Sequence, residues 1–316
     1  THGRAPDTPI ALVRWATLGR QRTLTGTLET IADRVKETGF KAPAVAVVGS
    51  VVNERDQINW FEKRPLFGER IVVTRTRHQA GALSRKLGEL GADVIELPTI
   101  RIEPPKDLLE FGRLVQDCHT YDWIVFTSPN GVDAFFDIFY KLFNDSRSIG
   151  GARIAVIGPG TAAKIKEMHL AVDLMPEKDF VAEGLVKAFK DHQNMENVTV
   201  LWVKAEESRE VVANELTGMG AIVDEAIAYR TVPETEDNTS AIDRLNDEGA
   251  DIITFTSSST VDCFFDLGLK LPENIKIASI GPVTTRTLEQ HGLSPAIKAK
   301  SHTIPGLVEA IVKHAK

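Results

Sequence analysis

The sequence predicts an α/β protein with two similar lobes, each built on a parallel sheet covered by helices. The main observation is an internal repeat, because DWIVFTSPNGVDAFFD (Asp122 to Asp137) returns as DIITFTSSSTVDCFFD (Asp251 to Asp266), with ten of sixteen positions identical. The flanking segments recur as well. IVVTRTRHQAGALSRKL from Ile71 corresponds to VLWVKAEESREVVANEL from Val200, and RIAVIGP corresponds to KIASIGP. A fixed internal period sets the architecture. Two copies of one α/β unit therefore predict two lobes, with a cleft of the kind that binds small ligands.

Composition narrows the class of function. The chain has 316 residues, 42% of them hydrophobic, which suffices for two ordinary cores. A net charge of −7 argues against a nucleic-acid surface. Two cysteines without CxxC spacing and scattered histidines predict neither a disulfide framework nor a metal site. No apolar run approaches the ~20 residues that span a bilayer, and no signal pattern occurs at the start, so we expect no membrane association and a cytoplasmic location.

Short β-branched runs alternate with helical stretches after residue 70, as in parallel sheets covered by helices. Ser128 followed by Pro129 predicts a helix N-cap with proline in the first turn. Gly91 and Gly220 occupy the position after a helix where a left-handed residue is favoured. The expected strands are 71–74, 94–97, 123–126, 154–157, 200–203, 222–225, 252–255 and 276–280.

Two runs follow the second strand of each copy and contain proline near their ends, TIRIEPP at 99–105 and AIAYRTVPE at 226–234. Ordinary surface loops are one interpretation. Alternating apolar and polar residues favour a pair of extended linkers between the lobes. Residues 1–66 stand outside the repeat and read as strand, helix and strand, a βαβ unit too small to hold a core alone.

Hydroxyl residues form the first group of candidate ligand-binding residues. Thr127 and Ser128 in one copy, and Thr256, Ser257 and Ser258 in the other, lie where a strand ends and a helix begins. Open α/β sheets bind ligands at that edge. The free N–H groups of a helix start can hold carboxylate or phosphate. Simple helix capping explains any one of these hydroxyls equally well.

The second group lies in the two IGP turns, where Gly158 and Thr161 correspond to Gly281 and Thr284. Glycine there allows a close approach of the backbone to a ligand. This motif is weak, since it matches neither the dinucleotide nor the nucleotide-triphosphate pattern.

The third group consists of side chains that can carry or donate a proton. Arg75, in TRTR with Arg77, and Lys204 at the corresponding position of the second copy each follow an apolar strand. Both are candidates for binding an anion, whereas most long charged side chains are simply solvated. Tyr229 lies in the second linker run, where it either packs or donates a proton at neutral pH.

The ordered set VVTRTRHQA, ELPTIRIEP, FTSPNGV, VIGPGTA, AYRTV, FTSSSTV and IGPVTTRTL resembles uroporphyrinogen-III synthase across residues 67–316. The segments PIALVRWAT, RQRTLTGTLETIA, PAVAVVGSVV and NWFEKRPLFG resemble the C-terminal end of uroporphyrinogen-III C-methyltransferase across residues 1–66. This order fits a bacterial fusion of the two enzymes. The S-adenosylmethionine loops of the methyltransferase family are absent, so methyl transfer by this chain alone is not expected.

The resemblance to the synthase implies a more specific organisation. One lobe would combine 67–98 with 235–316, the other would hold 106–225, and 99–105 with 226–234 would form a two-stranded hinge. The implied reaction cyclises hydroxymethylbilane with loss of water and inversion of ring D, without a cofactor. Tyr229 matches the family's hinge tyrosine.

The resemblance also leaves alternatives for the chain's role. One is a part of a bifunctional enzyme whose methyltransferase half is incomplete here. Another is a non-catalytic module that binds tetrapyrroles. The implied partners are hydroxymethylbilane itself and either an upstream methyltransferase portion or hydroxymethylbilane synthase.

Overall fold

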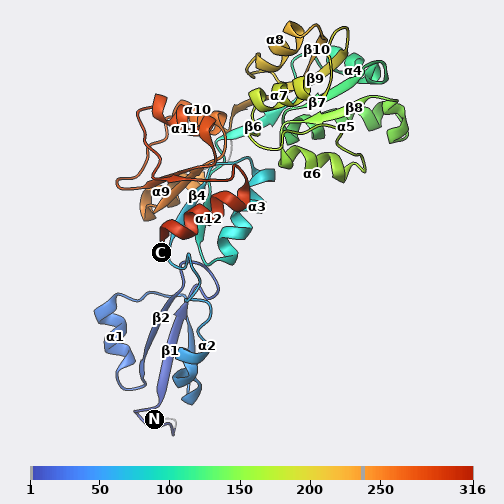
Figure 1. Cartoon of the computed structure of the whole chain (residues 1–316). Coiled ribbons are helices and arrows are strands. Elements are labelled where there is room, and N and C mark those ends of the chain that lie inside the picture. The colour runs from blue at the N-terminus through green and yellow to red at the C-terminus, as the bar shows by residue number, and fades with distance from the viewer. Residues whose placement is uncertain (1–2, 236–238, 316) are drawn as a thin grey trace. The chain divides into compact units, whose positions relative to one another are not determined.

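The structure is a computed structural model that describes residues 3–235 and 239–315, apart from the side chains of residues 77–80 and 239 (Figure 1). Arg77, singled out with Arg75 in the sequence, therefore has a side chain outside the described set. The chain forms two compact units. The first comprises the chain up to Ile100 and from Pro233 onward, and the second comprises Arg101–Val232.

The first unit contains an open five-stranded sheet in which every neighbouring pair is parallel. Its order is β13-β12-β11-β4-β5, formed by Ile297–Lys298, Lys276–Ser279, Ile252–Phe255, Arg70–Val73 and Asp93–Glu96.

Helices cover both faces of this sheet, because successive strand side chains point to opposite sides. Ile71 and Val73 pack with α3 (Arg77–Glu89) and α12 (Ile304–Ala315), which lie side by side in Figure 1. Val72 packs on the other face with residues from three further helices. These helices are α9 (Thr239–Glu248), α10 (Ser258–Asp266) and α11 (Pro282–Gln290).

The second unit repeats this three-layer arrangement. Its sheet order is β6-β10-β9-β7-β8, formed by Ile100–Glu103, Ile222–Pro233, Thr199–Ala205, Trp123–Phe126 and Arg153–Val156. The neighbouring pairs β10/β9, β9/β7 and β7/β8 are parallel.

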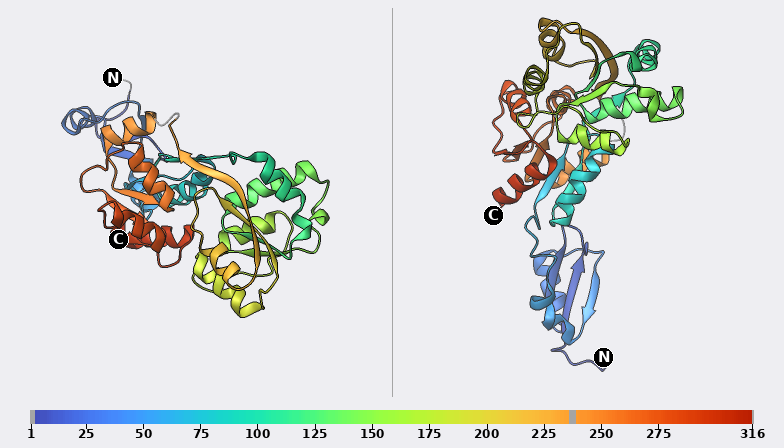
Figure 2. Two further views of the ribbon diagram at one scale, coloured as in Figure 1. Left: turned by 90° about the horizontal axis from the view of Figure 1, so that it is seen from above. Right: turned by 45° about the vertical axis from the view of Figure 1, so that its right-hand side comes forward.

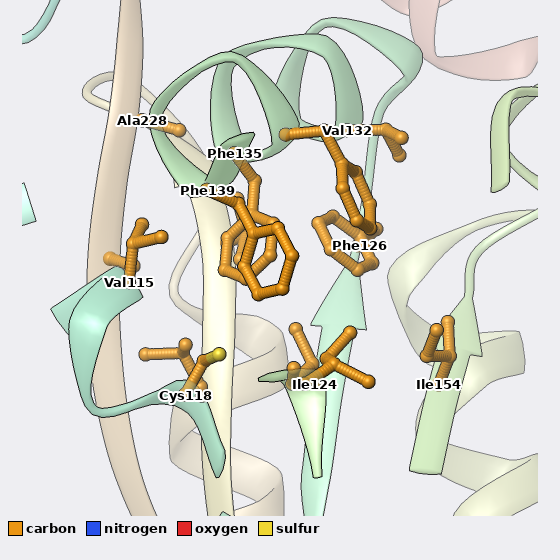
Figure 3. Close-up of a cluster of buried hydrophobic side chains, with 14 of the residues drawn as sticks. Val115, Cys118, Ile124, Phe126, Val132, Phe135, Phe139, Ile154 and Ala228 are labelled. Carbon is orange, nitrogen blue, oxygen red and sulfur yellow. The ribbon is translucent and has the colours of Figure 1, made fainter. Parts of the chain in front are cut away.

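Aromatic side chains fill one face of the second sheet. Phe126 on β7 packs against Phe135 on α5, with Phe139 one turn further, and Ile124 and Ile154 lie beside them (Figure 3). The helices on this face are α4 (Leu108–Gln116), α5 (Pro129–Leu142) and α6 (Pro159–Glu167), with the short 3-10 turns η2 (Cys118–Thr120) and η3 (Ser146–Ile149). The opposite face is covered by α7 (Ala182–His192) and α8 (Val211–Gly218).

Each sheet takes strands from both copies of the repeat, so neither unit is formed by one copy alone. The second sheet pairs β7 and β8 of the first copy with β9 and β10 of the second, and the first sheet pairs β4 and β5 with β11 and β12. The chain crosses from one unit to the other within β6, which follows the second strand of the first copy. It crosses back at the end of β10, which begins as the second strand of the second copy. The first half of each copy therefore shares a sheet with the second half of the other copy.

The predicted strands are confirmed to within a residue or two at most ends, and β7 and β11 have the predicted bounds. Ser128 caps α5 by accepting a hydrogen bond from the Gly131 N–H, with Pro129 in the first turn. Gly91 and Gly220 have φ of +98° and +92°, as expected after helix ends. β10 is longer than predicted and runs to Pro233, through most of the expected linker.

The N-terminal part of the first unit differs from the predicted βαβ unit. Its sheet has the order β2-β1-β3 and is antiparallel throughout, so the crossover of a βαβ unit is absent from it. The elements are β1 (Pro9–Arg14), β2 (Arg22–Thr27), α1 (Ile31–Thr38), β3 (Val45–Val48), η1 (Ser50–Glu54) and α2 (Arg55–Ile58).

The predicted strand, helix and strand do not include β2. Threonine at alternate positions, Thr23, Thr25 and Thr27, favours the extended chain instead. The turn before β2 holds Trp15 and Thr17 at positive φ, which folds β1 and β2 into a hairpin. Figures 1 and 2 show α1 beside these strands.

Among the described residues, every helix is too short or too polar to cross a membrane.

Candidate functional site

In the second unit, the predicted site residues gather at one edge of the sheet. Thr127 directly follows β7, Gly158 lies two residues after β8, and Lys204 is near the end of β9. Tyr229 on β10 pairs in register with Ala205, the last residue of β9. Because these strands are parallel, their carboxyl ends meet at one edge, which is the ligand-binding edge of an open α/β sheet.

Tyr229 and Ser128, separated by 101 residues in the chain, are in direct contact. The Tyr229 hydroxyl donates to Ser128 Oγ at 2.9 Å, and the same Oγ accepts the Gly131 N–H at 3.0 Å. Tyr229 is only 7% exposed. Burial raises the pKa of Tyr229, although hydrogen bonds with Ser128 and Asn130 act in the opposite direction. The phenol is therefore protonated at neutral pH and is held at the start of α5.

Thr127, which precedes the N-cap of α5, is held in place by Trp202. The sequence analysis did not select this tryptophan. Trp202 Nε1 donates to Thr127 Oγ1 at 3.3 Å, and Thr127 Oγ1 lies 3.5 Å from the Val203 carbonyl oxygen. The Trp202 side chain is almost completely buried. Its indole is thus a rigid support for the turn that carries Thr127 and Ser128.

Lys204 is buried and already ion-paired. Its side chain is 3% exposed, and Nζ lies 2.6 Å from Glu225 Oε2 and 3.0 Å from Glu210 Oε1. Burial alone would lower the pKa of Lys204, but the hydrogen bonds to Glu225 and Glu210 outweigh it and raise that pKa. Nζ also sits 4.7 Å from the Trp202 ring centroid. A substrate carboxylate that bound Lys204 would have to compete with both glutamates.

The glycine turn of the second unit is closely packed. Gly158 is the N-cap of α6, and a Cβ placed there would lie 3.0 Å from Phe180 Cβ. Thr161, one turn into α6, is buried. The absence of a side chain at Gly158 thus allows its backbone to pack closely against Phe180 at the carboxyl edge of the sheet. Thr161, in contrast, is shielded from solvent.

The first unit presents the corresponding residues at its own carboxyl edge. Arg75 follows β4, and burial lowers the pKa of its guanidinium. Thr256 follows β11 and precedes Ser257, the N-cap of α10. Ser257 Oγ accepts the Thr260 N–H at 3.2 Å, and Ser258 is the first residue of the helix. The capping interpretation therefore holds for Ser257, as it does for Ser128.

The second glycine turn of the first unit follows β12. Gly281 is the N-cap of α11, and a Cβ there would meet the His302 ring at 3.3 Å. Thr284 is buried within α11, like Thr161 in α6. The neighbouring Thr285 shares a hydrogen bond of 2.7 Å with Ser279 Oγ.

A cavity of about 500 Å³ in the first unit lies at the other edge of the sheet. Its lining includes Arg70 and Asp93, the first residues of β4 and β5, together with Trp15, Arg20 and Glu248. The arginines and acids pair with one another there: Arg70 lies 3.2 Å from Asp93 and 3.3 Å from Glu248. This cavity is separate from the carboxyl edge that carries the predicted residues. Within residues 3–235 and 239–315, no group of three or more His, Cys, Asp or Glu side chains is placed to hold a metal.

The sequence analysis selected residues at the carboxyl edge of the sheet but not the neighbouring residues that hold them in place. Asn130, Trp202, Glu210 and Glu225 act on Tyr229, Thr127 or Lys204. One signal was available, since Trp202 and Lys204 are two residues apart on β9 and so share a face. The contacts of Glu210 and Glu225 depend on packing that no local pattern encodes.

Two parallel-sheet units with polar carboxyl edges place the chain among two-lobed α/β proteins that act on small molecules. Solved structures agree on the fold. A mutant uroporphyrinogen III synthase from Thermus thermophilus gives a TM-score of 0.55 at 19% identity, covering 78% of this chain and 98% of that one. The enzyme named uroporphyrinogen-III synthetase from Helicobacter pylori gives 0.52 at 19% identity, covering 78% and 99%.

A family model described as uroporphyrinogen-III synthase HemD matches residues 81–309, and the chain therefore belongs to the uroporphyrinogen-III synthase family. Uroporphyrinogen-III synthase of Synechococcus elongatus is 31% identical over 265 residues, covering 80% of this chain and 98% of that protein. Porphyrin biosynthesis protein HemD of Ruminiclostridium josui is 30% identical over 313 residues, covering 98% of this chain but only 61% of that protein.

The N-terminal part matches a different group of proteins. Siroheme synthase of Stutzerimonas stutzeri is 44% identical over 61 residues, which cover 19% of this chain and 13% of that protein. Uroporphyrinogen-III C-methyltransferase of Bacillus subtilis is 35% identical over 179 residues, covering 57% of this chain and 36% of that protein. The chain thus joins a synthase-family region to a shorter segment found in methyltransferase proteins.

Proposed function

We propose that the chain is a uroporphyrinogen-III synthase, a cyclising hydro-lyase that converts hydroxymethylbilane to uroporphyrinogen III. Membership of the synthase family supports this activity. The structural observation that carries it is the buried Tyr229 hydroxyl on Ser128, at the edge where α/β sheets bind ligands.

The substrate is a linear tetrapyrrole with many carboxylates, and the helix starts suit it. The N-caps of α5 and α6 in the second unit, and of α10 and α11 in the first, are Ser128, Gly158, Ser257 and Gly281. Each start presents backbone N–H groups and the positive end of a helix dipole. Such groups hold carboxylates while adding no formal charge.

Tyr229 supplies the proton for the first chemical step. The substrate's hydroxyl leaves as water when its oxygen takes the phenolic proton, and the remaining carbon becomes part of an azafulvene cation. The hydrogen bonds with Ser128 and Asn130 lower the pKa of Tyr229 against the effect of burial, which favours loss of the phenolic proton. Attack by the substituted carbon of ring D on this cation gives a spirocyclic intermediate. The original bond from that carbon to its methylene bridge then breaks, and the free carbon of ring D bonds to this methylene, which closes the macrocycle with ring D inverted. The proton released by the free carbon of ring D restores the phenol.

Positioning accounts for the choice of isomer. Left alone, the bilane closes without inversion, so the enzyme must hold its two ends in the geometry that favours the substituted carbon. Thr127, supported by Trp202, and Arg75, Thr256 and Ser258 are the side chains we assign to substrate binding. For Thr161, Thr284 and Lys204, burial favours a supporting role over direct contact.

Residues 99–105 and 226–234 form the hinge in this proposal, between a lobe of 67–98 with 235–316 and a lobe of 106–225. β6 and β10 lie within or across these ranges and are neighbours in the sheet. Glu103 joins them, because it lies 2.6 Å from Arg101 on its own strand and 2.5 Å from Arg230 on β10. A hinge of two linked strands can bend as one piece when substrate enters.

A second candidate function follows from the N-terminal match. The first 66 residues would be the end of a methyltransferase, so that an upstream methyltransferase portion, or hydroxymethylbilane synthase, would be the chain's partner. Binding of S-adenosylmethionine to this chain alone would favour a methyltransferase role. A tetrapyrrole-binding module without catalysis would bind hydroxymethylbilane yet leave its closure unchanged.

The test is the isomer composition of the product. Hydroxymethylbilane is supplied with and without the chain, and the uroporphyrinogens are oxidised and separated. The proposal expects the type III isomer with the chain and the type I isomer without it. Equal proportions of type I in both samples would refute the proposal.

A further inference from the structure

Thr99 is a buried threonine at the point where the chain leaves the first unit. It lies between β5 and β6, and the first unit stops at Ile100 and resumes at Pro233. Thr99 is 0% exposed. A buried hydroxyl costs free energy unless it is hydrogen-bonded, so the partners of Thr99 show what the residue holds together.

Three segments of the first unit meet at Thr99. Its Oγ1 lies 3.2 Å from the carbonyl oxygen of Thr74, which directly follows β4, and 3.0 Å from the carbonyl oxygen of Thr260 in α10. The Thr99 N–H donates to the same Thr74 oxygen at 3.1 Å. The Thr99 carbonyl oxygen accepts the N–H of Glu234 at 3.0 Å, where the chain has returned to the unit. Thr99 therefore joins the outgoing and the returning chain to β4 and α10.

The two elements that Thr99 Oγ1 contacts carry the substrate-binding residues assigned to the first unit. Thr74 immediately precedes Arg75. Thr260 forms the capping box of α10 with Ser257, because its N–H donates to Ser257 Oγ at 3.2 Å and its hydroxyl donates to the Ser257 carbonyl oxygen at 2.7 Å. The residues on either side of Ser257 are those assigned to substrate binding. A shift of Thr260 would move this turn.

The second unit makes a comparable contact. Tyr229, near the end of that unit, donates to Ser128, the N-cap of α5. The caps Ser128 and Ser257 are 129 residues apart, whereas Thr99 and Tyr229 are 130 apart. The extra residue matches the register shift of β10 against β9, which falls between Ile227 and Tyr229. In both units, a hydroxyl near a crossing point bonds the start of the helix that follows the repeated motif.

We propose that Thr99 is a positioning residue of the synthase reaction, which keeps Arg75 and the start of α10 in the relative position that binds the substrate's carboxylates. This role rests on the proposed function. One hydroxyl serves both elements, since its proton lies between the two carbonyl oxygens. Without that hydroxyl, α10 loses a contact with a residue 161 positions away in the chain. Substrate binding weakens, while proton transfer from Tyr229 in the second unit continues at nearly its normal rate.

Two substitutions separate the hydroxyl of Thr99 from its volume. Thr99→Val keeps the volume and removes the hydroxyl, whereas Thr99→Ser keeps the hydroxyl and removes the methyl group. Steady-state conversion of hydroxymethylbilane by the full chain should show KM raised at least about fivefold in Thr99→Val, the equivalent of one hydrogen bond. Its kcat, and both constants of Thr99→Ser, should stay within about twofold of the parent.

Thr287→Val is the matched control. Thr287 is a buried threonine of the same unit, and its hydroxyl donates to the Val283 carbonyl oxygen within its own helix at 3.2 Å. Its substitution should leave KM and kcat within about twofold of the parent.

Hydrogen exchange measures the contact between Thr99 and α10 independently of the reaction. Peptides that cover residues 257–262 should exchange at least about fivefold faster in Thr99→Val than in the parent, because the first turn of α10 opens more readily. Peptides that cover residues 128–133, at the start of α5, should exchange at equal rates in the two proteins.

Unchanged exchange at the start of α10, or an unchanged KM in Thr99→Val, would overturn the positioning role. An equal rise of KM in Thr99→Ser and Thr99→Val would also overturn it, since lost packing would then explain both. A parent chain that yields only type I product would count against the synthase assignment, whereas the exchange rates would still decide whether Thr99 holds α10.

Discussion

Removing the Tyr229 hydroxyl tests the assignment of the proton donor. In Tyr229→Phe, the ring keeps its packing in a site that is 7% exposed, and the change deletes the hydrogen bonds with Ser128 and Asn130. Ser128 Oγ still accepts the Gly131 N–H. We therefore expect a loss of about 1 to 3 kcal/mol in the free energy of unfolding, the usual net value of two hydrogen bonds.

The effect on turnover should exceed the effect on stability. A positioned general acid contributes roughly 10²- to 10⁴-fold. The substrate's hydroxyl can also leave by protonation from water, so we expect kcat to fall by at least about tenfold, which is less than the full effect of a general acid. KM should change little, because the phenol acts on the departing hydroxyl rather than on the carboxylates.

The assay is steady-state conversion of hydroxymethylbilane, with type I and type III products quantified separately. Tyr140→Phe is the matched control, since Tyr140 lies exposed on α5 of the same unit. Denaturant unfolding of both variants establishes that each is folded. Turnover of Tyr229→Phe within twofold of the parent would refute the role of the phenol.

Three further predictions concern residues that support the fold and the site. Lys204→Met should cost about 1 to 2 kcal/mol in urea unfolding, since Glu210 and Glu225 are partly exposed and can rehydrate. It should lower kcat more than it raises KM. Glu62 has a pKa lowered to about 2, because hydrogen bonds from Thr23 and others outweigh the opposing effect of burial. The stabilisation by the Glu62 carboxylate is complete above the ordinary pKa of 4.5 and is lost as the pH falls toward 2. Glu62→Gln should therefore lower the free energy of unfolding at pH 7 by about 1 kcal/mol, because solvent screens this partly exposed group, and the difference from the parent should shrink as the pH falls. Gly19→Ala should destabilise the first unit by about 2 kcal/mol, because the new Cβ would lie 2.2 Å from the Ala92 backbone, while Gly88→Ala meets nothing within 4 Å and serves as the thermal-melting control.

The repeated motifs predicted much of the fold because their signals are local. β7 and β11 each follow an aspartate and end before a Thr-Ser pair, and Ser128 with Pro129 encodes its own helix start. β2 was not predicted, because the preference of its threonines for an extended chain is weak in so short a run and pairing with β1 decides its conformation. The repeat alone does not say which strands share a sheet, since that depends on where the chain crosses between units.

The candidate site was predictable as a set of positions but not as a network. The edge location of Thr127, Gly158 and Lys204 follows from strands of known direction. Their contacts do not follow, because Tyr229 meets Ser128 across 101 residues, and Glu225 reaches Lys204 from the neighbouring strand. Sequence patterns record which face a side chain occupies, whereas packing decides which partner it meets.

The product isomer formed by the unmodified chain is the most direct test of its assignment to the synthase reaction. Hydroxymethylbilane generated in the same vessel should give predominantly uroporphyrinogen III, in a proportion that rises with the amount of chain until it reaches a plateau. A product that stays uroporphyrinogen I at every amount of folded chain would contradict the assignment.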